Sequence, residues 1–181
     1  MLVTITDAAR GRGLTQTPAA AIERLYVAHR DPVVRYLRAI SPSDDDALDT
    51  AAFVFERAFA VLGRDPGKEL GLPWLLRTAR NATIDQARRR TVRRVAVTQI
   101  GTVLPLDPGP EDGYLARERA IALRSALAGL PDPARDAIVL RYGLGLPARE
   151  IGEVIGKGEE ATQKLITRSL ARLREVLDER P

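Results

Sequence analysis

The chain of 181 residues carries a formal net charge of +4, contains no cysteine and has a single histidine. These counts exclude disulfide scaffolds, thiolate zinc sites, thiol catalysis and multi-histidine metal sites. Hydrophobic residues make up 45% of the chain but aromatic residues only 4%, so we expect a core of Leu, Ala, Val and Ile, which suits helices better than a β-sandwich.

Capping residues place three helix starts in the first third of the chain. Residues 1–16 show no sustained period and are expected to form a disordered tail. Thr17–Pro18 pairs an N-cap residue with a proline at the first helical position, and Asp31–Pro32 repeats this signal, so a second helix is expected there. Ser41–Pro42–Ser43 then interrupts the helical pattern and caps a third helix. Its first turn holds the acids of 44–46, which oppose the positive end of the helix dipole.

The third helix is expected to bury one stripe and to end at Gly63. The stripe consists of Ala47, Ala51, Val54, Ala58 and Leu62.

An arginine-rich helix is expected to follow Gly71–Leu72–Pro73, with Arg77 and Arg80 on nearly one face and Asn81 adjacent. A basic strip beside an aromatic ring, Trp74, and an amide is what a single-strand-binding surface needs. The positive charges bind the backbone phosphates, the ring stacks on a base, and the amide hydrogen-bonds the edge of a base. The alternative is that Trp74 is a core residue and the arginines form a solvated face.

The helical periodicity of apolar residues ends after this helix, and we place a flexible linker at residues 93–118. The stretch 91–113 contains three prolines, three glycines and no clean period, which is typical of a linker. A strand over 95–100 is the competing interpretation, disfavoured because no partner strand is expected elsewhere.

Helical periodicity resumes at 114–130, and three further helices are expected after it. Pro131–Asp132–Pro133 supplies a stop, a cap and a proline at the first helical position for a helix that ends at Gly143. Leu146–Pro147 starts a shorter helix, and the turn Gly156–Lys157–Gly158 leads into a long final one.

The short helix, turn and long helix over 147–178 have the proportions of a DNA-binding helix-turn-helix. Short polar and basic side chains on the early turns of the second helix can hydrogen-bond base edges and phosphates. An ordinary helical hairpin with a solvated face explains the spacing about equally well. The residues expected to be exposed there are Glu160, Ala161, Gln163, Lys164, Thr167 and Arg168.

No residue pattern suggests catalysis, and we expect no enzyme activity, cofactor or metal. The sequence lacks a glycine-rich phosphate loop with a lysine and a nucleophile–base pair. His29 is expected near a helix C-terminus, and the acids of 44–46 are better explained by capping than by a metal. No apolar run reaches the length of a membrane span, and the N-terminus lacks a signal-peptide core, so a cytoplasmic protein without membrane insertion is expected.

The sequence resembles the extracytoplasmic-function (ECF) type of sigma factor over roughly residues 20–90 and 119–178. Three stretches carry the resemblance: DALDTAAFVFERAF at 46–59, PWLLRTARNATIDQARRR at 73–90, and LPDPARDAIVLRYGLGLPAREIGEVIG at 130–156. The second is the most specific, since a W-L-x-R-x-A-R-N run with a downstream basic cluster is close to a family signature.

The resemblance implies an all-α fold of two helical domains, at 17–92 and 119–181, joined by the linker at 93–118. The second domain would be a helix-turn-helix. The implied function is to direct RNA polymerase to specific promoters and initiate transcription. The implied partners are promoter DNA, core RNA polymerase and an anti-sigma factor.

The resemblance also implies roles for individual residues. The residues that would contact the minus-ten element are Trp74, Arg77, Arg80 and Asn81. Asn81 would help to hold an unstacked base. The backbone phosphates would be bound by Arg88, Arg89 and Arg90. The minus-thirty-five element would be read by the recognition helix through Glu160, Gln163, Lys164 and Arg168. Core polymerase would dock on the segment that holds Asp46, Asp49, Ala52, Phe53 and Arg57.

The sequence departs from the family pattern at two places. Leu48, Ala52 and Phe53 stand where the docking helix usually has polar residues. If these three side chains are exposed, they form an apolar patch that indicates a protein partner. The alternative function is then a sigma-like regulator that has lost standard polymerase docking. If the side chains are buried, they imply nothing unusual. In the recognition helix Leu165 replaces an expected arginine and Thr162 an expected apolar residue, so promoter specificity is expected to differ.

Overall fold

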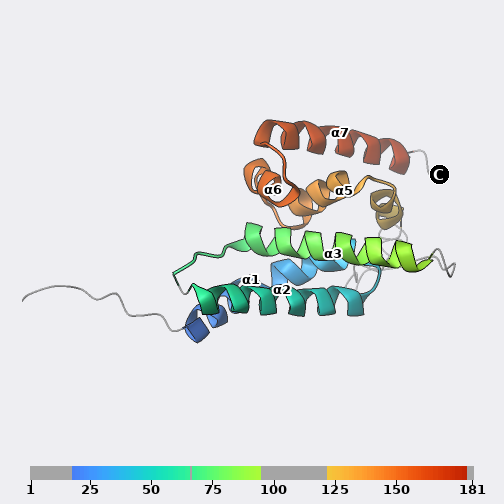
Figure 1. Ribbon diagram of the computed structural model, residues 1–181. Helices are drawn as coiled ribbons and strands as arrows, with labels where there is room; N and C mark the ends of the chain where they lie inside the picture. The colour runs from blue at the N-terminus through green and yellow to red at the C-terminus, as the bar shows by residue number, and fades with distance from the viewer. Residues whose placement is uncertain (1–17, 66, 95–121, 179–181) are drawn as a thin grey trace, which may run out of the picture.

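The computed structural model describes residues 18–65, 67–94 and 122–178, in which helices are the only regular secondary structure (Figure 1). The expected tail at 1–16 and most of the expected linker, with the competing strand at 95–100, lie outside these residues. A helical turn over 122–128 precedes α5. The labelled elements are α1 (Pro18–Ile40), α2 (Asp44–Arg64), α3 (Leu72–Arg94), α5 (Asp132–Ile138), the π-helical turn η1 (Val139–Gly143), α6 (Ala148–Ile155) and α7 (Glu159–Asp178).

The first helix, α1, is continuous, so the expected new start at Asp31–Pro32 is wrong. Pro32 lies inside it, although an interior proline costs about 3 kcal/mol. Residues on both sides of Pro32, among them Leu25 and Leu37, are buried in one core cluster, and each such side chain contributes about 1.5–3 kcal/mol. Shared burial therefore outweighs the local cost. His29 consequently lies well inside α1 rather than near a helix C-terminus.

The start of α2 agrees with the sequence prediction. Ser43 is the N-cap, and its hydroxyl oxygen accepts a hydrogen bond from the backbone N–H of Asp46 at 3.0 Å. The Ser43 hydroxyl also donates to the Asp46 carboxylate at 2.6 Å. Burial raises the pKa of Asp46, but the hydrogen bond from Ser43 and the ion pair with Arg90 outweigh this and leave the pKa below its usual range. All five residues of the predicted apolar stripe are buried.

Replacing Ser43 with alanine is expected to lower the free energy of unfolding by about 1 kcal/mol, because the backbone N–H of Asp46 loses its acceptor and the Asp46 carboxylate loses a donor. Ser41 is the matched control. Its hydroxyl is buried without a hydrogen-bond partner among the described residues, so Ser41→Ala is expected to be neutral or stabilising. Urea denaturation followed by circular dichroism measures both, and equal losses would contradict the assigned cap.

The third helix runs two residues into the expected linker, because it ends at Arg94 rather than near residue 92. Side-chain contacts hold it along α2. The Gln86 amide donates to the Thr50 hydroxyl at 3.2 Å, and Arg90 forms an ion pair with Asp46. These pairs join residues that lie 36 and 44 positions apart in sequence, so α2 and α3 form an antiparallel pair with α1 packed against both (Figure 1).

The C-terminal helices follow the predicted order with two corrections. Pro131, not Asp132, is the N-cap of α5, and Asp132 instead pairs with Arg135 at 2.9 Å. The helix expected to end at Gly143 does end there, but its last five residues form the π-helical turn η1. Gly156 ends α6 with a φ of 74°, the left-handed conformation that glycine adopts at low cost.

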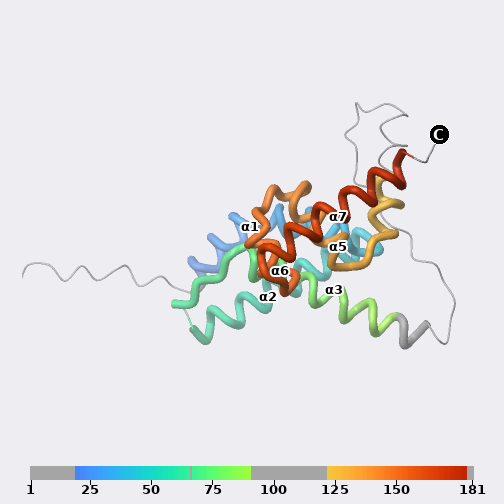
Figure 2. The backbone as a smooth tube through the Cα atoms, turned by 90° about the horizontal axis from the view of Figure 1, so that it is seen from above, coloured from blue at the N-terminus to red at the C-terminus, as the bar shows by residue number. Residues whose placement is uncertain are grey.

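The two halves of the chain pack against one another (Figures 1 and 2). One core cluster contains buried residues of α1, α2 and α3 together with residues of α5, η1 and α6. Helix α3 lies between α2 and α6 and contacts both. A second cluster packs the turn at 122–128 against α5 and α7. Within the described residues, no helix is long and apolar enough to cross a membrane.

Candidate nucleic-acid interface

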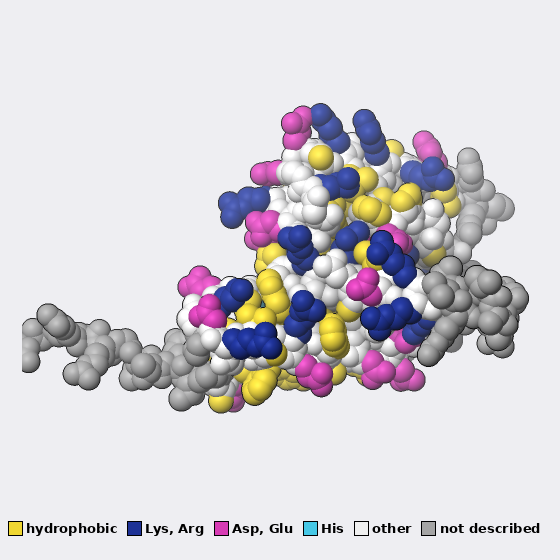
Figure 3. All heavy atoms as spheres, viewed as in Figure 1, with side chains coloured by type: hydrophobic (Ala, Val, Ile, Leu, Met, Phe, Trp, Pro, Cys, Tyr) yellow, Lys and Arg dark blue, Asp and Glu magenta, His cyan; other side chains and the backbone are white. Residues whose placement is uncertain are grey.

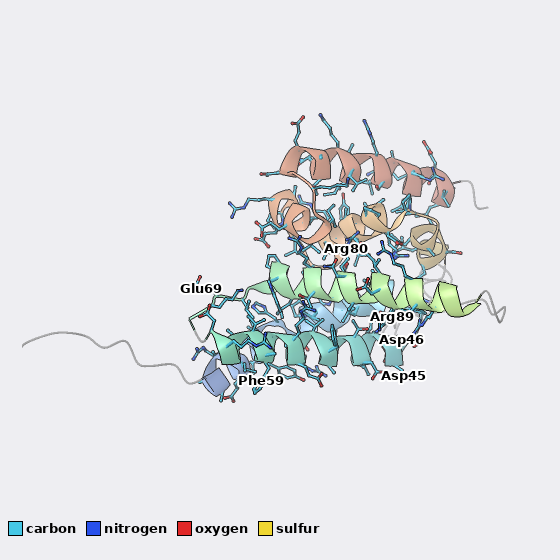
Figure 4. The ribbon with its side chains drawn as sticks, in the orientation of Figure 1. Asp45, Asp46, Phe59, Glu69, Arg80 and Arg89 are labelled. Atoms are coloured by element: carbon cyan, nitrogen blue, oxygen red, sulfur yellow. The ribbon has the colours of Figure 1, made fainter. Side chains whose placement is uncertain are left out.

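The predicted minus-ten residues on α3 separate into two sides of the helix. Arg77, Asn81 and Arg88 are exposed and follow one stripe, because they are spaced four and seven residues apart. Arg80 is only 14% exposed and points to the C-terminal half of the molecule, whereas Arg89 lies on the side toward α2 (Figure 4). The expectation that Arg77 and Arg80 share one face is therefore wrong: the 60° between them is enough to expose one and bury the other.

Two further predicted DNA contacts on α3 are engaged within the protein. Trp74 is half-buried and packs against the core cluster, which agrees with the alternative interpretation of this residue as part of the core. Arg90 forms an ion pair with Asp46, which the sequence placed in the polymerase-docking set. The pair ties the end of α3 to the start of α2.

A groove of about 460 Å³ runs between α2 and α3. It brings residues predicted for the minus-ten element, Asn81 and Arg89, next to residues predicted for polymerase docking, Phe53 and Arg57. Two guanidinium groups, an amide and an exposed ring in one groove can bind phosphate, hydrogen-bond a base edge and stack on a base. The lining residues are Phe53, Arg57, Thr78, Asn81, Ala82, Asp85, Gln86 and Arg89.

The helix-turn-helix has the geometry that its sequence predicts. Gly152 of α6 packs against the turn so closely that an added Cβ would lie 2.5 Å from the carbonyl oxygen of Lys157. Thr162 is fully buried beside it and donates to the carbonyl of Gly158 at 2.9 Å. The six predicted contact residues on α7 are all exposed. Lys164 forms an exposed i,i+4 ion pair with Glu160 at 2.6 Å.

Basic side chains gather over α3 and α7 on the face shown in Figure 3. The exposed predicted contact residues of α7 and the basic groove between α2 and α3 thus lie in different halves of the chain. Comparisons with known families agree with this division. Residues 25–93 match the family Sigma-70 region 2, and residues 126–175 match Sigma-70, region 4. The chain belongs to the sigma-70 family, in its ECF class.

Curated relatives and solved structures of sigma factors share this organisation. The ECF RNA polymerase sigma factor SigE of Mycolicibacterium smegmatis is 33% identical over 158 residues, which cover 86% of this chain and 61% of that protein. RNA polymerase sigma factor CarQ of Myxococcus xanthus is 29% identical over 160 residues, covering 88% and 90%. The chain spans 41% of a third relative, RfaY of Xanthomonas campestris, at 26% identity, so it corresponds to only part of SigE and RfaY.

Two solved complexes have the same fold. The sigma factor RpoE of Bartonella quintana, solved with the anti-sigma factor NepR, superposes with a TM-score of 0.73 at 18% identity, covering 89% of this chain and 99% of that one. CnrH, solved with the cytosolic domain of CnrY, gives a TM-score of 0.65 at 24% identity and covers 90% and 91%.

The region 2 helix α2 exposes the apolar residues that depart from the family pattern. Leu48 and Phe53 are 41% and 45% exposed, and Ala52, Asp49 and Arg57 are exposed as well. Hydrophobic side chains are visible along the lower edge of Figure 3, over α2. The interpretation that these side chains are buried is therefore wrong, and α2 exposes apolar side chains beside the charged Asp49 and Arg57.

Sequence reasoning missed the residues that join region 2 to region 4. Asp136 of α5 is 2% exposed and is bound by Tyr36 of α1 and Arg80 of α3. A signal was present in the sequence, since Asp136 is directly followed by the apolar run 137–140. An acid within such a run is buried with a partner, but the partners lie 100 and 56 residues away.

Proposed function

We propose that the chain acts as a sigma factor that directs core RNA polymerase to specific promoters. The groove between α2 and α3 would hold the melted minus-ten strand. The observation that carries this proposal is the groove itself, where Asn81, Arg89 and Arg57 converge beside an exposed ring, Phe53. Its volume is in the range of small-ligand sites, which suits an unstacked base better than a duplex.

Outside the groove, the exposed stripe of α3 would extend the single-strand path. Arg77 and Arg88 flank Asn81 along the helix and, among the described residues, form no ion pair such as those that hold Arg80 and Arg90. Charge on this stripe is solvent-accessible, so the phosphates of a strand seated in the groove can reach it.

Helix α7 would read the minus-thirty-five element as duplex DNA. Its six predicted residues lie on the first turns after the tight turn at Gly156, which is where a recognition helix enters the major groove. The ion pair of Lys164 with Glu160 is exposed on both sides and is worth little, so the lysine can exchange its partner for a phosphate.

The partners in this proposal are proteins and DNA, and the chain would act in the cytoplasm by binding rather than by chemistry. Core polymerase would dock on α2 through Asp49, Ala52, Phe53 and Arg57, which are exposed, with an apolar contribution that is unusual for the family. An anti-sigma factor is a further expected partner, because both structural neighbours were solved with a partner chain, NepR in one case and CnrY in the other.

Run-off transcription from genomic templates with the purified chain and core polymerase tests the proposal. Specific transcripts that require the chain are the expected result. Retained duplex binding without a stable polymerase complex would refute it. That outcome would favour the second candidate, a sigma-like regulator that works through another protein partner, for which the exposed Leu48 and Phe53 are the supporting observation.

Arg89→Ala is expected to weaken binding to a pre-opened promoter fragment about tenfold, because one charged contact from the groove to the strand is lost. Fluorescence anisotropy with a fragment that carries only the opened minus-ten region measures the change. Arg172→Ala removes the same charge from an exposed position on α7 and is expected to leave this affinity unchanged. Equal effects of the two substitutions would remove Arg89 from the site.

A further inference from the structure

Asp85 places an unpaired carboxylate in the groove between α2 and α3. It is the sole acid of the arginine-rich helix α3 and the sole acid among the groove's lining residues. Its side chain is exposed and forms no hydrogen bond or ion pair among the described residues. Asp46 and Asp136, which also lie beside α3, are each paired with an arginine of that helix. A free carboxylate repels the phosphates that the groove's arginines attract.

Most other polar side chains of the groove are already engaged within the protein. The Thr78 hydroxyl donates to a carbonyl of its own helix at 2.9 Å, and the Gln86 amide donates to a hydroxyl of α2 at 3.2 Å. Asn81 and Asp85 make no side-chain hydrogen bond among the described residues. They are spaced four residues apart and lie on one row of α3, so one ligand can contact both.

The rest of the groove is suited to hold a nucleotide. Arg89 follows Asp85 by one turn of α3 and lies on the side toward α2 (Figure 4), and Arg57 of α2 lines the same groove. Phe53 beside them is 45% exposed. The two guanidinium groups can bind backbone phosphates, and the ring can stack on a base. The free side chains, Asn81 and Asp85, are then left for the hydrogen-bonding edge of that base.

A carboxylate accepts hydrogen bonds and donates none, so it discriminates among the bases by the donors on their Watson–Crick edges. Guanine presents two adjacent donors, N1–H and the N2 amino group, which match the two oxygens of a carboxylate. Adenine and cytosine each present one amino group beside a ring nitrogen that repels a carboxylate. Thymine presents one N–H between two carbonyl oxygens. The amide of Asn81 can in addition donate to O6 of guanine.

We propose that Asp85 makes the groove selective for an unpaired guanine, whose N1–H and N2 amino group donate to the two carboxylate oxygens. This inference rests on the proposed function, in which the groove holds the melted minus-ten strand. The edge that Asp85 reads is occupied by cytosine in a duplex, so guanine is selected only after the strand has opened.

The test uses the full chain and fluorescein-labelled strands that carry a single base in a backbone of abasic sites, which fixes the nucleotide that can enter the groove. Fluorescence anisotropy compares four purines, so that stacking is similar throughout. These are guanine, adenine, hypoxanthine, which lacks the N2 amino group, and 7-deazaguanine, which keeps the Watson–Crick edge of guanine. Guanine is expected to bind about tenfold more tightly than adenine, as a bidentate contact provides. Hypoxanthine is expected to lie between them, and 7-deazaguanine to match guanine.

Asp85→Asn is expected to weaken binding of the guanine strand about tenfold and to leave binding of the adenine strand unchanged or tighter. The new amide can donate to N1 of adenine and accept from its N6 amino group. Poor folding would weaken both strands alike, so the difference between them reports on base selection. Asp45→Asn removes the same charge from an exposed position of α2 outside the groove, and its preference for guanine is expected to be unchanged.

Equal binding of guanine and adenine by the unmodified chain would overturn the selection. So would guanine binding that does not weaken when the N2 amino group is removed, or a preference that persists in Asp85→Asn. Failure of the proposed function has a separate signature, because the chain would then give no specific run-off transcripts with core polymerase. A chain that gives such transcripts without preferring guanine overturns this inference alone.

Discussion

Replacing Gly152 with alanine is expected to lower the free energy of unfolding by about 3 kcal/mol, the upper end of the cost of overpacking a buried site. The added Cβ would lie 2.5 Å from the Lys157 carbonyl oxygen and 3.2 Å from the Thr162 hydroxyl. The nearest atom belongs to the backbone of the turn, which is itself fixed because the Gly152 carbonyl accepts hydrogen bonds from the N–H groups of Gly156 and Lys157 at 2.8 and 2.9 Å. The angle between α6 and α7 must therefore change.

Gly63 of α2 provides the matched control for Gly152. A Cβ there would meet no atom within 4 Å, and Gly63→Ala is expected to stabilise the chain by up to about 1 kcal/mol through helix propensity. Urea denaturation measures both variants. Similar effects of the two substitutions would contradict the close approach at the turn. Loss of duplex binding in Gly152→Ala is expected alongside the loss of stability.

The double substitution Lys164→Ala, Arg168→Ala is expected to weaken binding to upstream promoter duplex by about 10- to 100-fold and to reduce the salt slope of binding by about 2. Both residues are exposed on the first turns of α7. The surface pair of Lys164 with Glu160 contributes little, so the change has little effect on folding. Anisotropy over a salt series, with the upstream duplex of a promoter mapped by run-off transcription, measures both quantities.

Arg30→Ala, Arg35→Ala is the control for this experiment, because it removes the same charge from exposed positions on α1. Its salt slope is expected to stay near that of the unmodified chain. If the control loses as much affinity as the α7 variant, binding follows total charge, and the assignment of α7 as the recognition helix is wrong.

Local sequence signals predicted most helix boundaries because those boundaries depend on neighbouring residues. Ser43 caps α2, Gly156 ends α6, and the stripe from Ala47 to Leu62 is buried as its spacing requires. The six residues of α7 that were predicted to be exposed are also exposed in the structure. Pro32 is the largest exception: the local signal for a new helix was present, but long-range burial on both sides of it kept α1 continuous.

The candidate site was only partly predictable. Its residue types follow from the basic helix, but their directions do not. Arg80 and Arg89 stand in the same arginine-rich segment, yet one is bound by Asp136 and the other lines the groove with Phe53. The groove itself depends on how α2 and α3 align, which is set by pairs such as Arg90 with Asp46, 44 residues apart.

The sequence by itself determined that this protein is helical, that positive charge lies on a helix of region 2, and that its last two helices have the proportions of a helix-turn-helix. Periodicity, capping and turn residues act within a few positions, so they can be read along the chain. Only the tertiary structure decided that α2 exposes apolar side chains and that Asp136 of region 4 binds Tyr36 and Arg80 of region 2. The contacts of Asp136 join buried groups that lie 56 and 100 residues apart along the chain, and no local pattern specifies that choice.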